Sequence, residues 1–275
     1  MIDQVAYLGA RVSDALEAFG EFARFCLATA YWTLRGRGTP RRWRLLIPQF
    51  YEIGTKSIPV VGIVGGFVGM VLAIEMFGQF QAYGLEDRLG GIINVSVVRQ
   101  IGPVLAAVMI AGRVGGAVSA ELGTMRVTEQ IDAMRAMGTD PIAYLVSPRV
   151  LACLFMVPLL TVFSNLLGIF GGYLVTVGGF GVNPTEYWAF SRQFVERYDV
   201  MSGLVKSVFF GLSIGLISCY KGFNCKPGAE GVGRAATDSF VTSFVAIIVL
   251  NFFLAKFLKD LYDLLYSSAM AGGVM

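Results

Sequence analysis

The chain has 275 residues, of which 55% are apolar and 15% are charged, and its mean hydropathy is +0.66. A soluble domain carries about 25% charged residues, so too little charge is present here to cover the exterior of a water-soluble fold. The composition therefore indicates an integral membrane protein. The sequence contains no histidine, which excludes Ser-His-Asp and Cys-His catalysis and imidazole metal sites.

Residues 3–33 have the charge pattern of an amphipathic helix. The charged residues recur every three or four positions, at Arg11, Asp14, Glu17, Glu21 and Arg24. Apolar side chains occupy the opposite face, which predicts a helix lying in the membrane interface rather than crossing the bilayer. A basic segment with two prolines follows. We therefore expect residues 1–48 to form an interfacial helix and a basic linker, and residues 49–275 to form a transmembrane domain.

Five apolar segments follow, and each is near or above the roughly 20 residues that a membrane-crossing helix needs. We expect the spans at about 55–80, 90–118, 149–178, 201–221 and 237–262. A cytoplasmic N-terminus places twelve Lys and Arg residues on the cytoplasmic side and three on the other side. Because cytoplasmic loops are enriched in Lys and Arg, we expect the N-terminus inside the cell and the C-terminus outside the membrane.

Glycine and proline mark particular places within these spans. Glycines recur at three- and four-residue spacing, at Gly62, Gly65, Gly66 and Gly69 in the first span and at Gly168, Gly171 and Gly172 in the third. Such small residues predict close helix packing. Pro103 and Pro158 lie inside spans and predict kinks. A GxSxG pattern at 211–215 lies inside a span of a chain without histidine, so we expect no catalytic residue there.

The longest cytoplasmic connection, at about 119–148, contains a short helix at about 126–138. We expect Thr128 to cap its start and Gly138 to follow its last turn, and Pro141 prevents its continuation. A helix lying on the bilayer would favour a basic polar face, whereas acidic and basic residues balance here. The pattern therefore favours docking of this helix to another protein.

The segment ELGTMRVTEQIDAMRAMGTDPIAYLVSPRVLA at 121–152 resembles the signature of the MlaE-type permeases, the membrane subunits of bacterial Mce/Mla lipid-transporting ABC systems. Three further segments are similar to the same family: RQIGPVLAAVMIAGRVGGA at 99–117, LVKSVFFGL at 204–212 and GVGRAATDSFV at 231–241. The resemblance extends from about residue 50 to 255. It implies an all-α integral membrane protein with an interfacial helix, five transmembrane helices and a cytoplasmic coupling helix.

The resemblance also implies function and partners. It implies a homodimeric permease in the bacterial inner membrane that moves phospholipid between that membrane and a periplasmic ring of Mce-domain proteins. The C-terminus is then periplasmic, and no nucleic acid is bound. A separate cytoplasmic ATPase binds ATP in such systems, and the sequence itself contains no Gly-Lys dipeptide and hence no Walker A loop. We expect no cofactor, no metal and no catalytic residue in this chain.

Three ionisable residues, Glu75, Arg99 and Lys206, lie in or near the spans. A charge near the centre of a membrane helix costs about 2.5–3.5 kcal/mol on insertion scales, so each needs a physical reason. We expect Arg99 and Lys206 to meet in the outer half of the membrane and to present positive charge to a lipid phosphate. The alternative is an interhelix pair, for example Arg99 with Glu75, that only fixes packing.

Family resemblance extends the candidate lipid site. The residue after the corresponding arginine is usually glutamate in the family, whereas this chain has Gln100, whose amide can still hydrogen-bond a head group. Leu72, Phe80 and Tyr83 match the lipid-facing stretch of the family, although Tyr83 also suits an interfacial aromatic. The expected substrate-binding residues are Leu72, Glu75, Phe80, Tyr83, Arg99, Gln100 and Lys206.

In the short cytoplasmic helix we expect four residues to contact the ATPase: Glu129, Asp132, Arg135 and Gly138. The alternative is that Asp132 and Arg135 only pair with each other. Two other classes of function stay open at this point, an ion-coupled secondary transporter and a non-transporting scaffold for an Mce ring. The small number of ionisable groups in the spans argues against the first, because ion relays need them.

Overall fold

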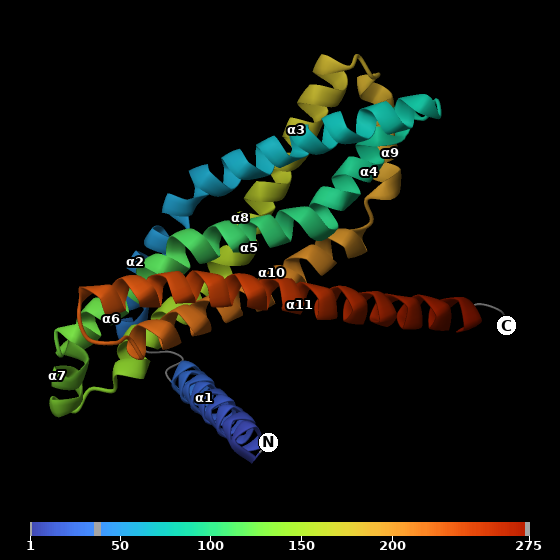
Figure 1. The fold of residues 1–275 in the computed structure, drawn as a ribbon. Helices are drawn as coiled ribbons and strands as arrows, with labels where there is room; N and C mark the ends of the chain where they lie inside the picture. The colour runs from blue at the N-terminus through green and yellow to red at the C-terminus, as the bar shows by residue number, and fades with distance from the viewer. Residues whose placement is uncertain (1, 36–39, 273–275) are drawn as a thin grey trace.

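The computed structural model describes residues 2–35 and 40–272, and every regular element within them is a helix (Figure 1). Five stretches of this described chain are long and apolar enough to cross a membrane. They are Arg44–Ala82, Glu86–Val127, Ile142–Gly179, Arg197–Phe223 and Ala229–Leu264. The expected all-α membrane fold with five spans is therefore confirmed.

The N-terminal helix α1 (Ile2–Arg35) lies against one end of the bundle. The ring of Tyr220 packs edge-on against Phe22, with ring centroids 5.1 Å apart, and against Phe25 at 5.6 Å. Leu16 and Phe19 stay exposed, so an apolar face of α1 is available to the membrane surface. Helix α2 (Pro40–Ile53) begins within the segment that we expected to be a linker; the domain boundary at residue 48 stays a prediction.

The first span continues through a short turn into α3 (Ile58–Ala82), which packs against α8 (Ser147–Tyr173) of the third span. Glycines on both helices form this contact. A Cβ atom added to Gly69 would lie 1.9 Å from the carbonyl oxygen of Gly168, and one added to Gly171 would lie 2.2 Å from that of Gly66. The predicted glycine packing is therefore confirmed, because only glycine permits this backbone approach.

The second span is divided by two π-helical turns. It consists of α4 (Leu89–Ser96), a π turn (Val97–Ile101), α5 (Gly102–Ile110), a second π turn (Ala111–Gly115) and α6 (Gly116–Val127). The span changes direction between α4 and α5 (Figure 1), where Pro103 lies in the first turn of α5. The bend expected at Pro103 is present, and its local form is a π turn.

The third connection contains a helix that the sequence analysis did not predict, α9 (Pro184–Phe194). The Asn183 side chain caps it by accepting from the Thr185 N–H at 2.9 Å. Fully buried Tyr187 donates to Asn94 Oδ1 at 3.2 Å, and Asn94 Nδ2 donates to Ser191 Oγ at 2.8 Å. Burial raises the pKa of Tyr187 to about 12. These bonds hold α9 against α4, beside the start of the second span.

Two long helices complete the bundle. α10 (Arg197–Phe223) begins with a capping box in which the Glu196 N–H donates to Asp199 Oδ2 at 3.0 Å. α11 (Ala229–Gly272) runs along α10 and α6 and continues past the bundle (Figure 1). The main core lies between α5, α6, α8 and α10 and includes fully buried Ile110, Leu160 and Phe210. This packing holds α5 and α6, the part of the second span that follows the π turn at Val97–Ile101.

Candidate functional site

The first candidate site is built around the π turn at Val97–Ile101. Pro103 has no N–H, so the carbonyl of Arg99, four residues earlier, lacks its α-helical donor. The Gly102 N–H instead reaches back to the carbonyl of Val97. Lys206 Nζ on α10 donates to the Arg99 carbonyl at 3.1 Å. The proline thus creates a backbone acceptor that a lysine from another span occupies.

Lys206 is 2% exposed and has a second partner in this cluster. Its Nζ donates to Gln100 Oε1 at 2.6 Å. α10 approaches the π turn closely here because Gly203 has no side chain, and a Cβ there would lie 2.4 Å from the carbonyl of Val98. Since Gln100 is uncharged, it binds the ammonium without neutralising it. The positive charge of Lys206 is therefore retained beside Arg99.

The Arg99 side chain is 43% exposed and lies at the edge of this cluster. Its Nη1 is 3.6 Å from Asp199 Oδ1, and its guanidinium lies 5.9 Å from the centroid of the Tyr198 ring. The alternative pairing of Arg99 with Glu75 is not formed. Asp199 and Tyr198 were not predicted from the sequence, although the Glu196–Asp199 spacing at the start of an apolar span is a recognisable capping signal.

Two neighbouring cavities share Arg99 and Tyr198. The larger, of about 330 Å³, is lined by these residues and by Ile92, Val95, Ser96, Phe194, Tyr262 and two acidic residues, Glu196 and Asp199. The smaller, of about 120 Å³, is lined in addition by Gln100, Ser202, Lys206, Ala255 and Leu258. A guanidinium and an ammonium thus border concave surface that also has aromatic and aliphatic walls. This combination suits a phosphate carrying apolar chains.

The structure brings together three of the seven predicted lipid-site residues, namely Arg99, Gln100 and Lys206. Leu72 and Phe80 pack against an adjoining apolar cluster that includes Val97, the first residue of the π turn. Glu75 is exposed, and Tyr83 is 80% exposed beyond the end of α3. Neither contacts the Arg99–Lys206 cluster through a described ion pair or hydrogen bond, so their role toward lipid stays a prediction.

The second candidate site is the short helix α7 (Gln130–Ala136), which lies at the far end of the bundle together with the end of α6 (Figure 1). The expected cap at Thr128 is wrong, because α6 runs on to Val127 and the Thr128 hydroxyl donates to the Thr124 carbonyl at 2.9 Å. The chain turns instead at Glu129, whose φ is +58°. Such a left-handed conformation is costly for a residue with a Cβ.

The end of α7 agrees with the sequence analysis. Gly138 has φ +74°, and its N–H bonds to the Arg135 carbonyl at 2.9 Å. The Thr139 N–H bonds to the Met134 carbonyl at 3.0 Å, which completes a Schellman motif. Asp140 then accepts from the Ile142 N–H at 2.8 Å and starts the third span. The helix is thus held between two defined turns.

One face of α7 is anchored and the other is exposed. Ile131 is fully buried, and Met134 packs against the main core. On the exposed face, Asp132 accepts from Arg126 Nη1 at 2.7 Å through both carboxylate oxygens and from Arg135 Nη1 at 3.3 Å. The expected Asp132–Arg135 pair is present, but Arg126 makes the shorter contact. Glu129 has no described pairing partner on this face and is available to another protein.

The chain is similar to bacterial membrane permeases over most of its length. The family described as "Permease MlaE" matches residues 46–257 of the chain. The "Probable ABC transporter permease protein" of Rickettsia bellii is 40% identical over 249 residues, which cover 90% of this chain and 95% of that protein. The "Intermembrane phospholipid transport system permease protein MlaE" of Haemophilus influenzae is 32% identical over 256 residues, covering 92% and 97% of the two chains.

A plant protein is similar to the same region. "Protein TRIGALACTOSYLDIACYLGLYCEROL 1, chloroplastic" of Arabidopsis thaliana is 35% identical over 215 residues, which cover 78% of this chain and 61% of the plant protein. The matched region in the family comparison contains both candidate sites, the Arg99–Lys206 cluster and α7.

Proposed function

Since the chain belongs to the MlaE permease family, we propose that it is the membrane subunit of an ABC transporter that moves phospholipid between the inner membrane and a periplasmic Mce-protein carrier. The observation that carries this proposal is the Arg99–Gln100–Lys206 cluster, in which the partly exposed guanidinium borders both cavities and the buried ammonium borders the smaller one. The family name and the phospholipid named for the Haemophilus influenzae relative support the choice of substrate.

Arg99 and Lys206 have complementary parts in this proposal. The exposed guanidinium of Arg99 binds phosphate oxygens with its fork of donors. Lys206 is held in place by two acceptors, Gln100 Oε1 and the Arg99 carbonyl, so that its ammonium is already ordered before lipid arrives. The aromatic and aliphatic residues around them, such as Phe194 and Leu258, contact the acyl chains. No covalent chemistry is needed.

The second span links this site to the helix that we propose binds the ATPase. The Arg99 site is at the π turn before α5, and α6 ends beside α7. A partner ATPase that pushes on α7 therefore acts on the same span that carries Arg99. Closure of the ATPase pair is proposed to move this span in each protomer of a homodimer, to narrow the cavities beside Arg99 and to displace the bound lipid.

The proposal also covers the orientation of the chain in the membrane and the chain that hydrolyses ATP. We place the chain in the bacterial inner membrane with a cytoplasmic N-terminus and α7 on the cytoplasmic side, following the Lys and Arg distribution. ATP hydrolysis is assigned to a separate chain, because this sequence has no Walker A loop. The Mce-domain ring is assigned to the periplasmic side, above α9 and the end of α3.

A photo-crosslinking experiment tests the proposed lipid site. A photoreactive amino acid replaces Tyr198, which lines both cavities, in the purified chain reconstituted with radiolabelled phosphatidylglycerol. The matched control carries the same group at Trp188, an exposed aromatic of α9 outside both cavities. We expect lipid adducts at position 198 well above the control and their reduction by Lys206→Met. Equal labelling at both positions would favour a scaffold that captures no lipid at this site.

A further inference from the structure

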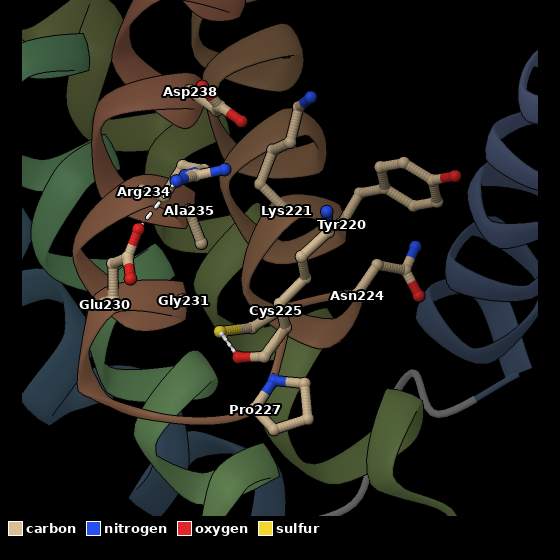
Figure 2. A pocket seen from close by; sticks show the side chains of 11 residues that line it. Tyr220, Lys221, Asn224, Cys225, Pro227, Glu230, Gly231, Arg234, Ala235 and Asp238 are labelled. Carbon is tan, nitrogen blue, oxygen red and sulfur yellow. Dashed lines mark hydrogen bonds and ion pairs between the residues drawn. The ribbon is translucent and has the colours of Figure 1, made fainter.

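A further polar cavity, shown in Figure 2, is lined by the last residues of α10. Lys206 of the Arg99–Lys206 cluster lies toward the opposite end of the same helix. Lys206 and Lys221 are separated by about 22 Å along the helix axis at 1.5 Å per residue. The cavity measures about 300 Å³ and is bounded by the end of α10, the connecting loop and the first turns of α11. Its size and distance from Arg99 make it a separate site.

The loop before α11 and the first turn of α11 form one side of this cavity. Gly228 has φ +92°, and a Cβ on Gly231 would lie 2.0 Å from the carbonyl of Lys226, so the loop folds tightly over the start of α11. The Val232 N–H makes the first bond of the helix, to the Gly228 carbonyl at 3.3 Å. The preceding N–H groups therefore have no intrahelical acceptor, and they lie at the positive end of the 44-residue helix α11.

Three basic side chains surround this helix start: Lys221, Lys226 and Arg234. Arg234 Nη2 bonds to Glu230 Oε1 at 2.7 Å. Among the residues that the structure describes, no ion pair involves Lys221 or Lys226. Asp238 is the other acidic residue of the lining, so basic side chains outnumber acidic ones. The lining thus combines unpaired ammonium groups with backbone donors, which is the chemistry that binds phosphate.

An exposed apolar surface begins directly beside these charges. Val241 and Val245 follow Arg234 and Asp238 at helical spacing on the same face of α11, and they are 51% and 53% exposed. On the α10 side, Tyr220 lines the cavity and packs against Phe22 of the amphipathic helix α1. The cavity therefore lies where polar loop meets membrane-facing surface, the depth at which lipid head groups lie.

We propose that this cavity binds the phosphate of a phospholipid head group from the leaflet on the α1 side of the membrane. Lys221, Lys226 and the first N–H groups of α11 contact the phosphate, and an acyl chain lies along Val241 and Val245. The lipid at this site is a resident one that holds the α10–α11 connection beside α1. It is distinct from the lipid that binds at Arg99.

Cys225 provides a site-specific readout because its side chain lines the cavity and donates a hydrogen bond to the Lys226 carbonyl. Cys153 and Cys219 are buried, and Cys26 is removed by Cys26→Ser. The experiment measures the rate at which maleimide alkylates Cys225 in the purified full chain, in detergent, as dioctanoyl-phosphatidylglycerol is added. A parallel series adds inorganic phosphate alone. The test variant is Lys221→Gln/Lys226→Gln, and the charge-matched control is Arg44→Gln/Lys56→Gln, which lies outside the cavity.

We expect the lipid to slow alkylation of the parent and of the control at the same concentrations. In the test variant, half-protection is expected to need at least tenfold more lipid, while thermal stability is unchanged because both lysines are at least partly exposed. Protection that survives the double substitution, or that is equally strong with inorganic phosphate at matched concentration, would overturn the assignment to a lipid. If the control variant also needed at least tenfold more lipid for half-protection, the attraction between charge and lipid would be non-specific. That result would also overturn the assignment to a lipid.

Discussion

Gln100→Glu is the most informative single change at the Arg99–Lys206 cluster, because it alters charge and almost nothing else. Gln100 Oε1 is 2.6 Å from Lys206 Nζ, so the introduced carboxylate forms an ion pair in the place of the present hydrogen bond. The site then loses one net positive charge. The fold is expected to be at least as stable, since a buried ammonium gains a charged partner that is already in contact distance.

The distance between the new carboxylate and a bound phosphate gives the expected loss of lipid affinity in Gln100→Glu. A phosphate bonded to the other side of the ammonium would lie about 5–6 Å from the new carboxylate, and two such charges repel by about 3 kcal/mol at an effective dielectric constant near 20. Arg99 is partly exposed, so water reduces this value. We therefore expect the dissociation constant for phosphatidylglycerol to rise by about tenfold to a hundredfold, at 1.4 kcal/mol per tenfold.

The assay is equilibrium binding of fluorescent short-chain phosphatidylglycerol to the purified chain, with diacylglycerol as the matched control ligand. Diacylglycerol has the same acyl chains and no phosphate, so its affinity is expected to be unchanged by Gln100→Glu. Thermal unfolding of both proteins controls for the fold. Unchanged phosphatidylglycerol binding, or an equal loss of affinity for diacylglycerol, would refute the reasoning that Lys206 and Arg99 act on phosphate.

Three further predictions concern packing, the coupling helix and pH. Gly69→Ala places a Cβ 1.9 Å from the Gly168 carbonyl oxygen and should lower the free energy of unfolding by about 1–3 kcal/mol. The control Gly78→Ala places its Cβ in open space and should not lower the free energy of unfolding. Denaturant unfolding measures both variants. Glu129→Gly relieves the left-handed conformation at φ +58° and should raise stability by about 1 kcal/mol in the same assay. Glu129→Arg should reduce co-purification of the partner ATPase while lowering stability by at most about 1 kcal/mol, because it places a positive charge at the N-terminus of α7. Since the pKa of Tyr187 is raised to about 12 from about 10 in the unfolded chain, its contribution to stability is complete below pH 10 and is lost as the pH rises toward 12. In thermal unfolding measured from pH 9 to 12, the stability of Tyr187→Phe should fall less steeply with pH than that of the parent. An equally steep fall in both proteins would show that other groups cause the loss of stability.

The sequence predicted those features that depend on local pattern. The five spans follow from apolar length, and the glycine contacts between α3 and α8 follow from spacing within each helix. Gly138 was predictable because the residue after a helix end commonly takes a positive φ, which glycine adopts without strain. Thr128 was misassigned because local sequence does not show where α6 ends, and the turn is made by Glu129, a residue with no preference for that conformation.

The candidate lipid site was predictable only in part. Intramembrane charge singled out Arg99 and Lys206, and the structure does bring Lys206 to the backbone of Arg99. The reason lies in Pro103, which leaves the Arg99 carbonyl without its helical donor, and this consequence needs the neighbouring helix before it can be recognised. Asp199 was not predicted as a partner of Arg99, because this contact depends on how α10 packs against the second span. α9 was missed although Asn183 and Pro184 form a helix-start signal.

The central claim is that this chain moves phospholipid only when a separate ATPase drives it. Its most direct test is transfer of a fluorescent phospholipid out of vesicles that contain the purified chain, with and without its partner ABC ATPase and ATP, and with the ion gradients collapsed. We expect transfer that requires both the ATPase and ATP and that continues when ionophores are present. Gln100→Glu is expected to slow this transfer. ATP hydrolysis by the chain alone, or lipid transfer that follows a proton or sodium gradient without the ATPase, would contradict it.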